Sequence, residues 1–261
     1  MKARLKAVWE SLRNAVRPGR VRTLKIPDGD PGALLCAAHW TDRSTVLRLC
    51  LPPRLLVMEG GFTYTTASHH FLAAIEHGRH TLAEFYQRFQ PQNIAAMYAV
   101  SGGRCGSDLP PWEIPWIGKA RSRAPRGEGG LGPEHGTAIY GPATDKKVDL
   151  EMQRLTGTYE SIRSHGYQPD RHGDITGFLL RRGQEFRFLV RGGKHRTAAL
   201  VHLGHPLVPV QFKPHWPRII DRADVAHWPL VREGRMDEAL AQDIFDCHFG
   251  LTLEQRYSGI L

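Results

Sequence analysis

The stretch "FRFLVRGGKHRTAALVHLGHPLVPV", residues 186–210, decides how the second half of this chain folds. It predicts a β-strand, a tight glycine turn, a helix whose first residues are Lys194, His195 and Arg196, and a second strand. Gly192 and Gly193 allow the backbone of the turn to approach a ligand closely. Because the first amides of a helix lack partners within it, the turn is a candidate seat for a phosphate, and a solvated helix cap is the alternative.

The sequence on either side of this stretch predicts more of the same α/β pattern. Residues 145–166, "DKKVDLEMQRLTGTYESIRSHG", carry an apolar stripe at helical spacing and end at Gly166, which is positioned as a C-terminal cap. Residues 174–190, "DITGFLLRRGQEFRFLV", predict two strands around an Arg-Gly turn. Residues 236–250, "MDEALAQDIFDCHFG", predict a closing amphipathic helix.

The first hundred residues mix short β-prone runs with helices. We expect extended segments in "VRTLKI" (21–26), "ALLCAAHW" (33–40) and "TVLRLCL" (45–51). Helices are expected in "SHHFLAAIEHG" (68–78), "TLAEFYQRFQ" (81–90) and "PQNIAAMYAV" (91–100), the last with Pro91 in its first turn. The density of histidine in this part suggests a metal, but without matched carboxylate or cysteine spacing we do not predict a metal site.

Residues 101–136 are rich in glycine and proline and show no period, so they are expected to form a linker or a long loop. Trp112 and Trp116 suggest that the first half of this segment packs, whereas the basic "GKARSRAPRGEGG" is expected to be more mobile. The expected organisation is an N-terminal α+β region over 1–100, for specificity or partner binding, and a C-terminal α/β domain over 137–261.

Composition narrows the class of partner. A net charge of +9 favours an anionic partner, whether a nucleotide, a nucleic acid, a glycan or a membrane surface. No apolar run is long enough for a transmembrane helix, and the four scattered cysteines fit a reducing cytoplasm. Residues 2–17 form a basic amphipathic pattern, for which a docked helix is preferred over weak contact with a membrane surface.

The order of "SIRSHGYQP" (161–169), "ITGFLL" (175–180) and the opening stretch resembles the ParB/sulfiredoxin-like (ParB/Srx) domain superfamily. The resemblance covers about residues 138 to 213 and leaves residues 1–100 uncovered. Residues 69–91 and 139–151 look like those of a bacterial subgroup with an additional N-terminal region. The resemblance implies a compact α/β fold that binds a nucleoside triphosphate, with its phosphates at the glycine turn.

Members of this superfamily differ in their chemistry, so the fold alone does not assign a reaction. A sulfiredoxin would have a cysteine where this chain has Lys194, and sulfinic-acid chemistry requires that thiol. A CTP-dependent DNA clamp would continue into a helix-turn-helix domain, for which the segment after residue 213 is too short. The kinase members remain, and they imply ATP or another nucleoside triphosphate, Mg²⁺, and a small-molecule or glycan hydroxyl as acceptor.

The resemblance also implies individual residues. Glu151 is the expected catalytic base, Glu160 is the rival carboxylate, and His195 acts beside them. An acidic residue often precedes the turn in kinase members, but here the position is Arg191, so the metal ligands stay unknown, with Asp174 or Asp149 as substitutes. The residues implied for nucleotide binding are Gly192, Gly193, Lys194, His195, Arg196, Thr197 and Gln168.

Two other functions remain open at this point. The chain could be a non-catalytic module for nucleotides or nucleic acid, in which the positive charge contacts phosphates. Nucleic acid is the less favoured partner, because no helix-turn-helix is predicted. A nuclease is weaker again, since the sequence shows no clear acidic metal cluster. ATP-dependent phosphoryl transfer to a small-molecule or sugar hydroxyl is the leading hypothesis.

Overall fold

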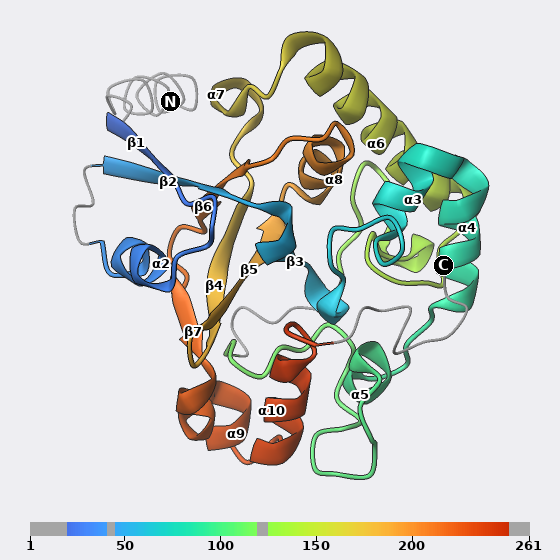
Figure 1. Ribbon diagram of the computed structural model, residues 1–261. Helices are drawn as coiled ribbons and strands as arrows, with labels where there is room; N and C mark the ends of the chain where they lie inside the picture. Colours follow the sequence, from blue (N-terminus) through green and yellow to red (C-terminus); the bar gives the residue numbers. More distant parts are fainter. Residues whose placement is uncertain (1–19, 41–44, 119–124, 251–261) are drawn as a thin grey trace, which may run out of the picture.

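The structure is a computed structural model, and it describes residues 20–40, 45–118 and 125–250 (Figure 1). Within these residues a mixed sheet runs in the order β1-β2-β6-β4-β5-β3, and β7 pairs with β4 beside it. The α/β (α+β) fold class expected from the sequence is confirmed. The strands are β1 (Arg20–Lys25), β2 (Thr45–Leu51), β3 (Leu56–Val57), β4 (Thr176–Arg182), β5 (Glu185–Gly192), β6 (Val208–Phe212) and β7 (Ile219–Asp221).

The sheet does not divide at the boundary expected around residues 101–136. β2 pairs antiparallel with β6, and β3 pairs parallel with β5, so strands of both expected regions share one sheet. The physical reason lies in burial: most of β2 and all of β3 is buried, and strands with buried side chains need the rest of the sheet and the helices to cover them. The N-terminal region is therefore part of the scaffold that holds the C-terminal glycine turn.

The helices gather mainly on one side of the sheet. Helices α3, α4, α6 and α8 pack against one another, whereas α9 and α10 lie at the other end of the sheet (Figure 1). The α-helices are α2 (Pro31–Ala38), α3 (His70–His77), α4 (Arg79–Arg88), α5 (Ile94–Tyr98), α6 (Asp145–His165), α7 (Pro169–His172), α8 (Lys194–His202), α9 (Pro229–Arg232) and α10 (Glu238–Asp246). Short 3₁₀ helices are η1 (Pro53–Leu55), η2 (Glu59–Gly61), η3 (Pro133–His135) and η4 (Arg222–His227).

Two local predictions for the first half were wrong. The run "ALLCAAHW" forms α2 instead of a strand, because the Asp30 side chain accepts hydrogen bonds from the amides of Gly32 and Ala33 and Pro31 begins the helix. Helix α5 begins at Ile94 and not near Pro91, because Asn93 caps it. Capping side chains outweighed β-propensity and proline position in both cases.

The glycine- and proline-rich segment contributes to the core and to the site described below. Trp116 is 4% exposed, and its ring lies 5.3 Å from both Trp228 and Phe245, which confirms that the first half packs. Part of the segment expected to be mobile, including Glu128, contacts α6. Residues 119–124 lie outside the described residues.

Among the described residues, no helix combines the length and the apolar character that crossing a bilayer requires. The expected amphipathic helix at residues 2–17 falls outside the described residues, so its docking or membrane contact stays a prediction.

Candidate functional site

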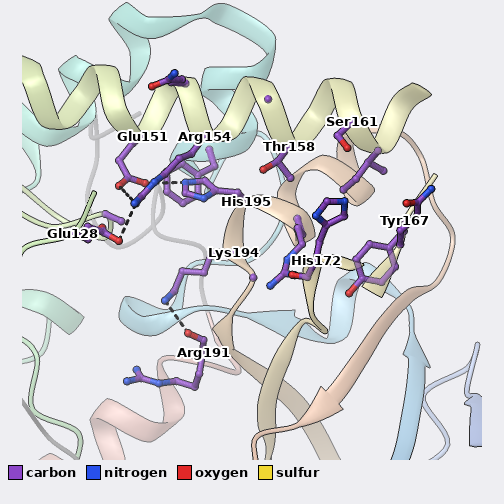
Figure 2. A pocket seen from close by; sticks show the side chains of 18 of the residues that line it. Glu128, Glu151, Arg154, Thr158, Ser161, Tyr167, His172, Arg191, Lys194 and His195 are labelled. Carbon is purple, nitrogen blue, oxygen red and sulfur yellow. Dashed lines mark hydrogen bonds and ion pairs between the residues drawn. The ribbon is translucent and has the colours of Figure 1, made fainter. Parts of the chain in front are cut away.

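A cleft of about 740 Å³ lies between the middle of α6 and the first turn of α8. Figure 2 shows Glu151, Arg154 and His195 together at one end of this cleft, with Tyr167 and His172 at the other. The cleft is lined by Phe71, Glu128, Ala138, Glu151, Gln153, Arg154, Gly157, Thr158, Ser161, Ile162, Gly166, Tyr167, Gln168, His172, Arg191, Gly193, Lys194, His195 and Arg196. Its size is typical of a small-molecule or cofactor site.

The first turn of α8 presents backbone amides to the cleft. Gly193 adopts a left-handed conformation with φ of 84°, which favours glycine, and no side chain caps the helix. Within the described residues, the amides of Lys194, His195 and Arg196 have no hydrogen-bond acceptor. Unsatisfied amides at the positive end of a helix dipole have the geometry that an anion seat needs, and anion binding at this turn stays a prediction from the sequence.

The three basic side chains of this turn have different partners. The Nζ of Lys194 lies 3.4 Å from the Oε2 of Glu59, and the Nε2 of His195 lies 2.9 Å from the Oε2 of Glu151. Lys194 and His195 line the cleft and are each about one-fifth exposed, so both can reach a ligand.

Arg196 has a structural task that the sequence did not predict. Its guanidinium donates hydrogen bonds to the carbonyl oxygens of His172, Gly173 and Asp174, at the end of α7. Arg196 therefore holds the loop that forms the far wall of the cleft. A phosphate contact from Arg196 would compete with these three bonds.

Glu151 is fully buried and lies at the centre of a charged network. Its Oε1 accepts a hydrogen bond from Lys147 at 2.7 Å and lies 3.4 Å from Arg154. Burial alone would raise the pKa of Glu151, but His195 and Lys147 outweigh it and hold the pKa at about 2. A carboxylate with so low a pKa is a weak proton acceptor at neutral pH, so its geometry suits the positioning of His195 better than the role of base.

Glu128 joins this network from the glycine-rich segment. Its carboxylate pairs with Lys147, and its Oε2 lies 2.9 Å from Arg154. No sequence pattern predicts this role, because Glu128 lies among glycines without helical or strand periodicity. Its place is set by α6, about twenty residues further along the chain.

Glu59 is the second buried carboxylate that sequence reasoning missed. It comes from η2, is 7% exposed, and forms ion pairs with Arg191 and Lys194. Burial would raise the pKa of Glu59, but the two cations hold it below its ordinary value. The acidic group that the kinase resemblance would place at position 191 is absent, and Glu59 brings a carboxylate to that position from elsewhere in the chain. A lone charge inside the apolar run "LLVMEGGF" is the signal that could have revealed it.

The remaining predicted residues divide into two groups. Gln168 lines the cleft, and its side-chain amide donates to the carbonyl of His165. Gly192, Thr197 and Glu160 do not line it: Thr197 is buried and donates to the carbonyl of Gly193, and Glu160 pairs with Arg163 on an exposed part of α6. The structure thus brings Glu151 to the turn and leaves Glu160 away from it.

The two suggested metal ligands lie elsewhere as well. Asp149 pairs with Arg79 at 2.5 Å, and Asp174 pairs with Arg48 at 2.8 Å; neither lines the cleft. Within the described ranges no three histidine, cysteine or acidic side chains converge as a metal site. Both carboxylates that line the cleft, Glu128 and Glu151, form ion pairs with cationic side chains, so these residues do not provide a protein-built site for Mg²⁺.

The histidines near the start of α3 belong partly to the core. His69 and His70 are fully buried, and the Nε2 of His70 lies 3.0 Å from the carbonyl oxygen of Ala138. Burial lowers the pKa of His70 to about 3, so this imidazole is neutral at physiological pH. Its ring stacks on Phe85 at 4.2 Å, which is a packing role.

No family model matches this chain, and neither the curated proteins nor the solved structures contain a match to it. The resemblance to the ParB/Srx superfamily therefore stays a prediction that rests on the residues quoted for it. What the fold and the site define is a mixed α/β protein with a basic cleft at the start of a glycine-initiated helix.

Proposed function

We propose that the cleft binds a nucleoside triphosphate, with ATP as the leading candidate, and that the protein transfers its terminal phosphoryl group to a hydroxyl of a small molecule or glycan. The observation that carries this proposal is the uncapped first turn of α8, which opens into the cleft beside Lys194. Four cationic side chains but only two carboxylates line the cleft, and this excess of positive charge suits a polyanion. The ParB/Srx resemblance, which rests in part on the same turn, implies the same ligand.

In this proposal each group has a role. The amides of the turn and Lys194 would hold the phosphates and stabilise charge on the transferring group. The acceptor oxygen forms the new bond to phosphorus, the bond to the bridging oxygen breaks, and a nucleoside diphosphate leaves. His195 takes the acceptor proton on Nδ1, because Glu151 contacts Nε2 and fixes the ring. We thus propose His195 as the base and Glu151 as its positioning residue.

Nucleotide binding is expected to stabilise the protein measurably. ATP, CTP and GTP, each with and without Mg²⁺, are compared by thermal shift; a ligand at a hundred times its Kd adds about 2.7 kcal/mol. Lys194→Ala removes a charged donor, so we expect affinity to fall about 10-fold or more. Lys146→Ala is the matched control, since Lys146 is exposed on α6 and lines neither the cleft nor the cavity next to it. No stabilisation of the wild-type protein by any of the three nucleotides would refute the proposal.

A second candidate function, binding of single-stranded nucleic acid, is favoured by one specific surface. A groove of about 720 Å³ is lined by Trp40, Trp216, Lys213 and Arg218, and no acidic side chain of the described residues lines it. The Nζ of Lys213 lies 4.3 Å from the Trp216 ring, and Arg22 lies 4.9 Å from the Trp40 ring. Aromatic platforms with interleaved cations are typical of proteins that bind single strands.

This alternative predicts salt-dependent binding of a thymidine oligonucleotide without nucleotide turnover. The logarithm of the association constant should fall linearly with the logarithm of salt concentration. Trp216→Ala should weaken binding by about 5-fold or more, from the loss of stacking. Binding unaffected by salt or by Trp216→Ala would rule out this use of the groove.

A further inference from the structure

A second cavity, of about 440 Å³, adjoins the cleft. Four residues line both spaces: Glu128, Ala138, Arg191 and Lys194. A ligand in the second cavity would therefore lie next to Lys194, the residue proposed to hold the transferring phosphoryl group. This arrangement is what a reaction between two substrates needs, since the reacting atoms must meet at a shared wall.

The charges of the two spaces differ. In the second cavity three cations, Arg126, Arg191 and Lys194, face three carboxylates, so the lining is balanced, whereas the cleft is positive. The three carboxylates, Glu59, Glu113 and Glu128, also each have a cationic partner in the structure. A balanced lining gives no long-range attraction to a polyanion, which indicates a neutral ligand.

The walls of the second cavity combine aromatic and apolar surface with a buried hydroxyl. Its apolar lining includes Met97, Tyr98, Trp112, Ile114, Ile117 and Tyr140. Tyr140 is 8% exposed, and its Oη has no hydrogen-bond partner among the described residues. Burial raises the pKa of Tyr140 to about 12, so the phenol keeps its proton and can donate. Buried hydroxyls normally find a partner, and a ligand hydroxyl would supply one.

We propose that the second cavity binds a neutral mono- or disaccharide. Sugars present C–H faces that pack on aromatic side chains, and hydroxyls that exchange hydrogen bonds with groups such as Tyr140 and the carboxylates of the lining. In the phosphoryl transfer, which rests on the proposed function, a sugar hydroxyl would attack from this cavity across Lys194. The bond between the sugar oxygen and phosphorus forms, the bond from phosphorus to the leaving nucleoside diphosphate breaks, and the hydroxyl proton passes to His195. Saccharide binding itself does not depend on the nucleotide.

Saccharide binding is tested directly on the full chain without nucleotide. Tryptophan fluorescence and calorimetry are recorded with a panel of neutral pentoses, hexoses, deoxyhexoses, N-acetylhexosamines and disaccharides, beside hexuronates and amino acids. We expect at least one neutral saccharide to bind, and Trp112→Phe to remove most of its fluorescence change. Tyr140→Phe should weaken that saccharide about 5-fold, the effect of one lost hydrogen bond.

Tyr86→Phe is the matched control. Tyr86 is also buried, and its hydroxyl has no hydrogen-bond partner among the described residues, but it lines neither the cleft nor the second cavity. The Tyr86→Phe variant should therefore bind the saccharide as tightly as the wild type. Ile117→Trp, which fills the cavity, should abolish saccharide binding while MgATP still binds. If no neutral saccharide binds, or only anionic compounds do, the inference is wrong even where nucleotide binds. If a saccharide binds and no nucleotide does, the proposed function fails and this inference stands.

Discussion

His195→Ala is expected to lower kcat for nucleotide turnover by about 10²–10⁴-fold, the usual contribution of a general base. Nucleotide affinity should change little, because the phosphates are proposed to contact backbone amides and Lys194. The imidazole is held on two sides, by Glu151 at 2.9 Å and by the Phe71 ring at 4.4 Å. ADP release from MgATP, with and without saccharide acceptors, measures kcat, and calorimetry measures affinity.

The control for this variant lies on the same helix. His202→Ala removes an imidazole from the last turn of α8, where it packs against Tyr159 at 5.3 Å and does not line the cleft. Its kcat should match the wild type. Glu151→Gln should lower kcat with little change in nucleotide affinity, because the ring loses the carboxylate that orients it. An undiminished kcat in His195→Ala would exclude His195 as the base.

Lys147→Met is expected to reduce the free energy of unfolding by about 3–5 kcal/mol, the cost of removing one partner from a buried ion pair. Lys147 is 1% exposed, and the Glu151 carboxylate that it contacts is fully buried. Without the ammonium, Glu151 keeps only His195 and a longer contact with Arg154. Urea denaturation at neutral pH measures the change.

Two variants show whether the lost pairing is the cause. The double variant Lys147→Met with Glu151→Met should recover most of the stability, because it replaces the pair with apolar groups of similar volume. Glu160→Gln breaks an exposed pair with Arg163 on the same helix and should cost less than about 1 kcal/mol. A Lys147→Met variant as stable as Glu160→Gln would contradict the account of this network.

Acid titration checks the same pair by a separate route. The pKa of Glu151 in the folded protein is about 2, below its ordinary value of 4.5, so its ionisation stabilises the fold fully above about pH 4.5. That contribution is lost as the pH falls toward 2. The stability difference between the wild type and Glu151→Gln should therefore shrink over this range.

The sequence predicted the elements whose signals are local. Helix α6 with Gly166 at its end, the β4–β5 hairpin, and α8 after the glycine turn all follow from spacing and turn residues. The glycine turn that begins α8 was also predictable, whereas anion binding at this turn stays a prediction. The errors came where capping side chains prevailed, as at Asp30 in α2.

The charged network could not be derived in the same way. Glu59, Glu128 and Glu151 are far apart in the sequence. The sheet and helix packing bring Glu59 to Lys194, Glu128 to Lys147, and Glu151 to His195. Glu151 was indicated by the resemblance alone. No periodicity links Glu59 to Arg191, since their contact depends on β3 pairing with β5. Whether such a carboxylate is buried can be determined only from the residues that pack around it in the folded chain.

Hydrogen–deuterium exchange tests the central claim most directly. The amides of Lys194, His195 and Arg196 have no acceptor among the described residues, so they should exchange fast in the free protein. With saturating MgATP, a peptide covering residues 190–198 should become protected, while one covering α10, which does not line the cleft, stays unchanged. Unaltered exchange at 190–198, with or without protection at Trp40 and Trp216, would contradict a nucleotide seat at the start of α8.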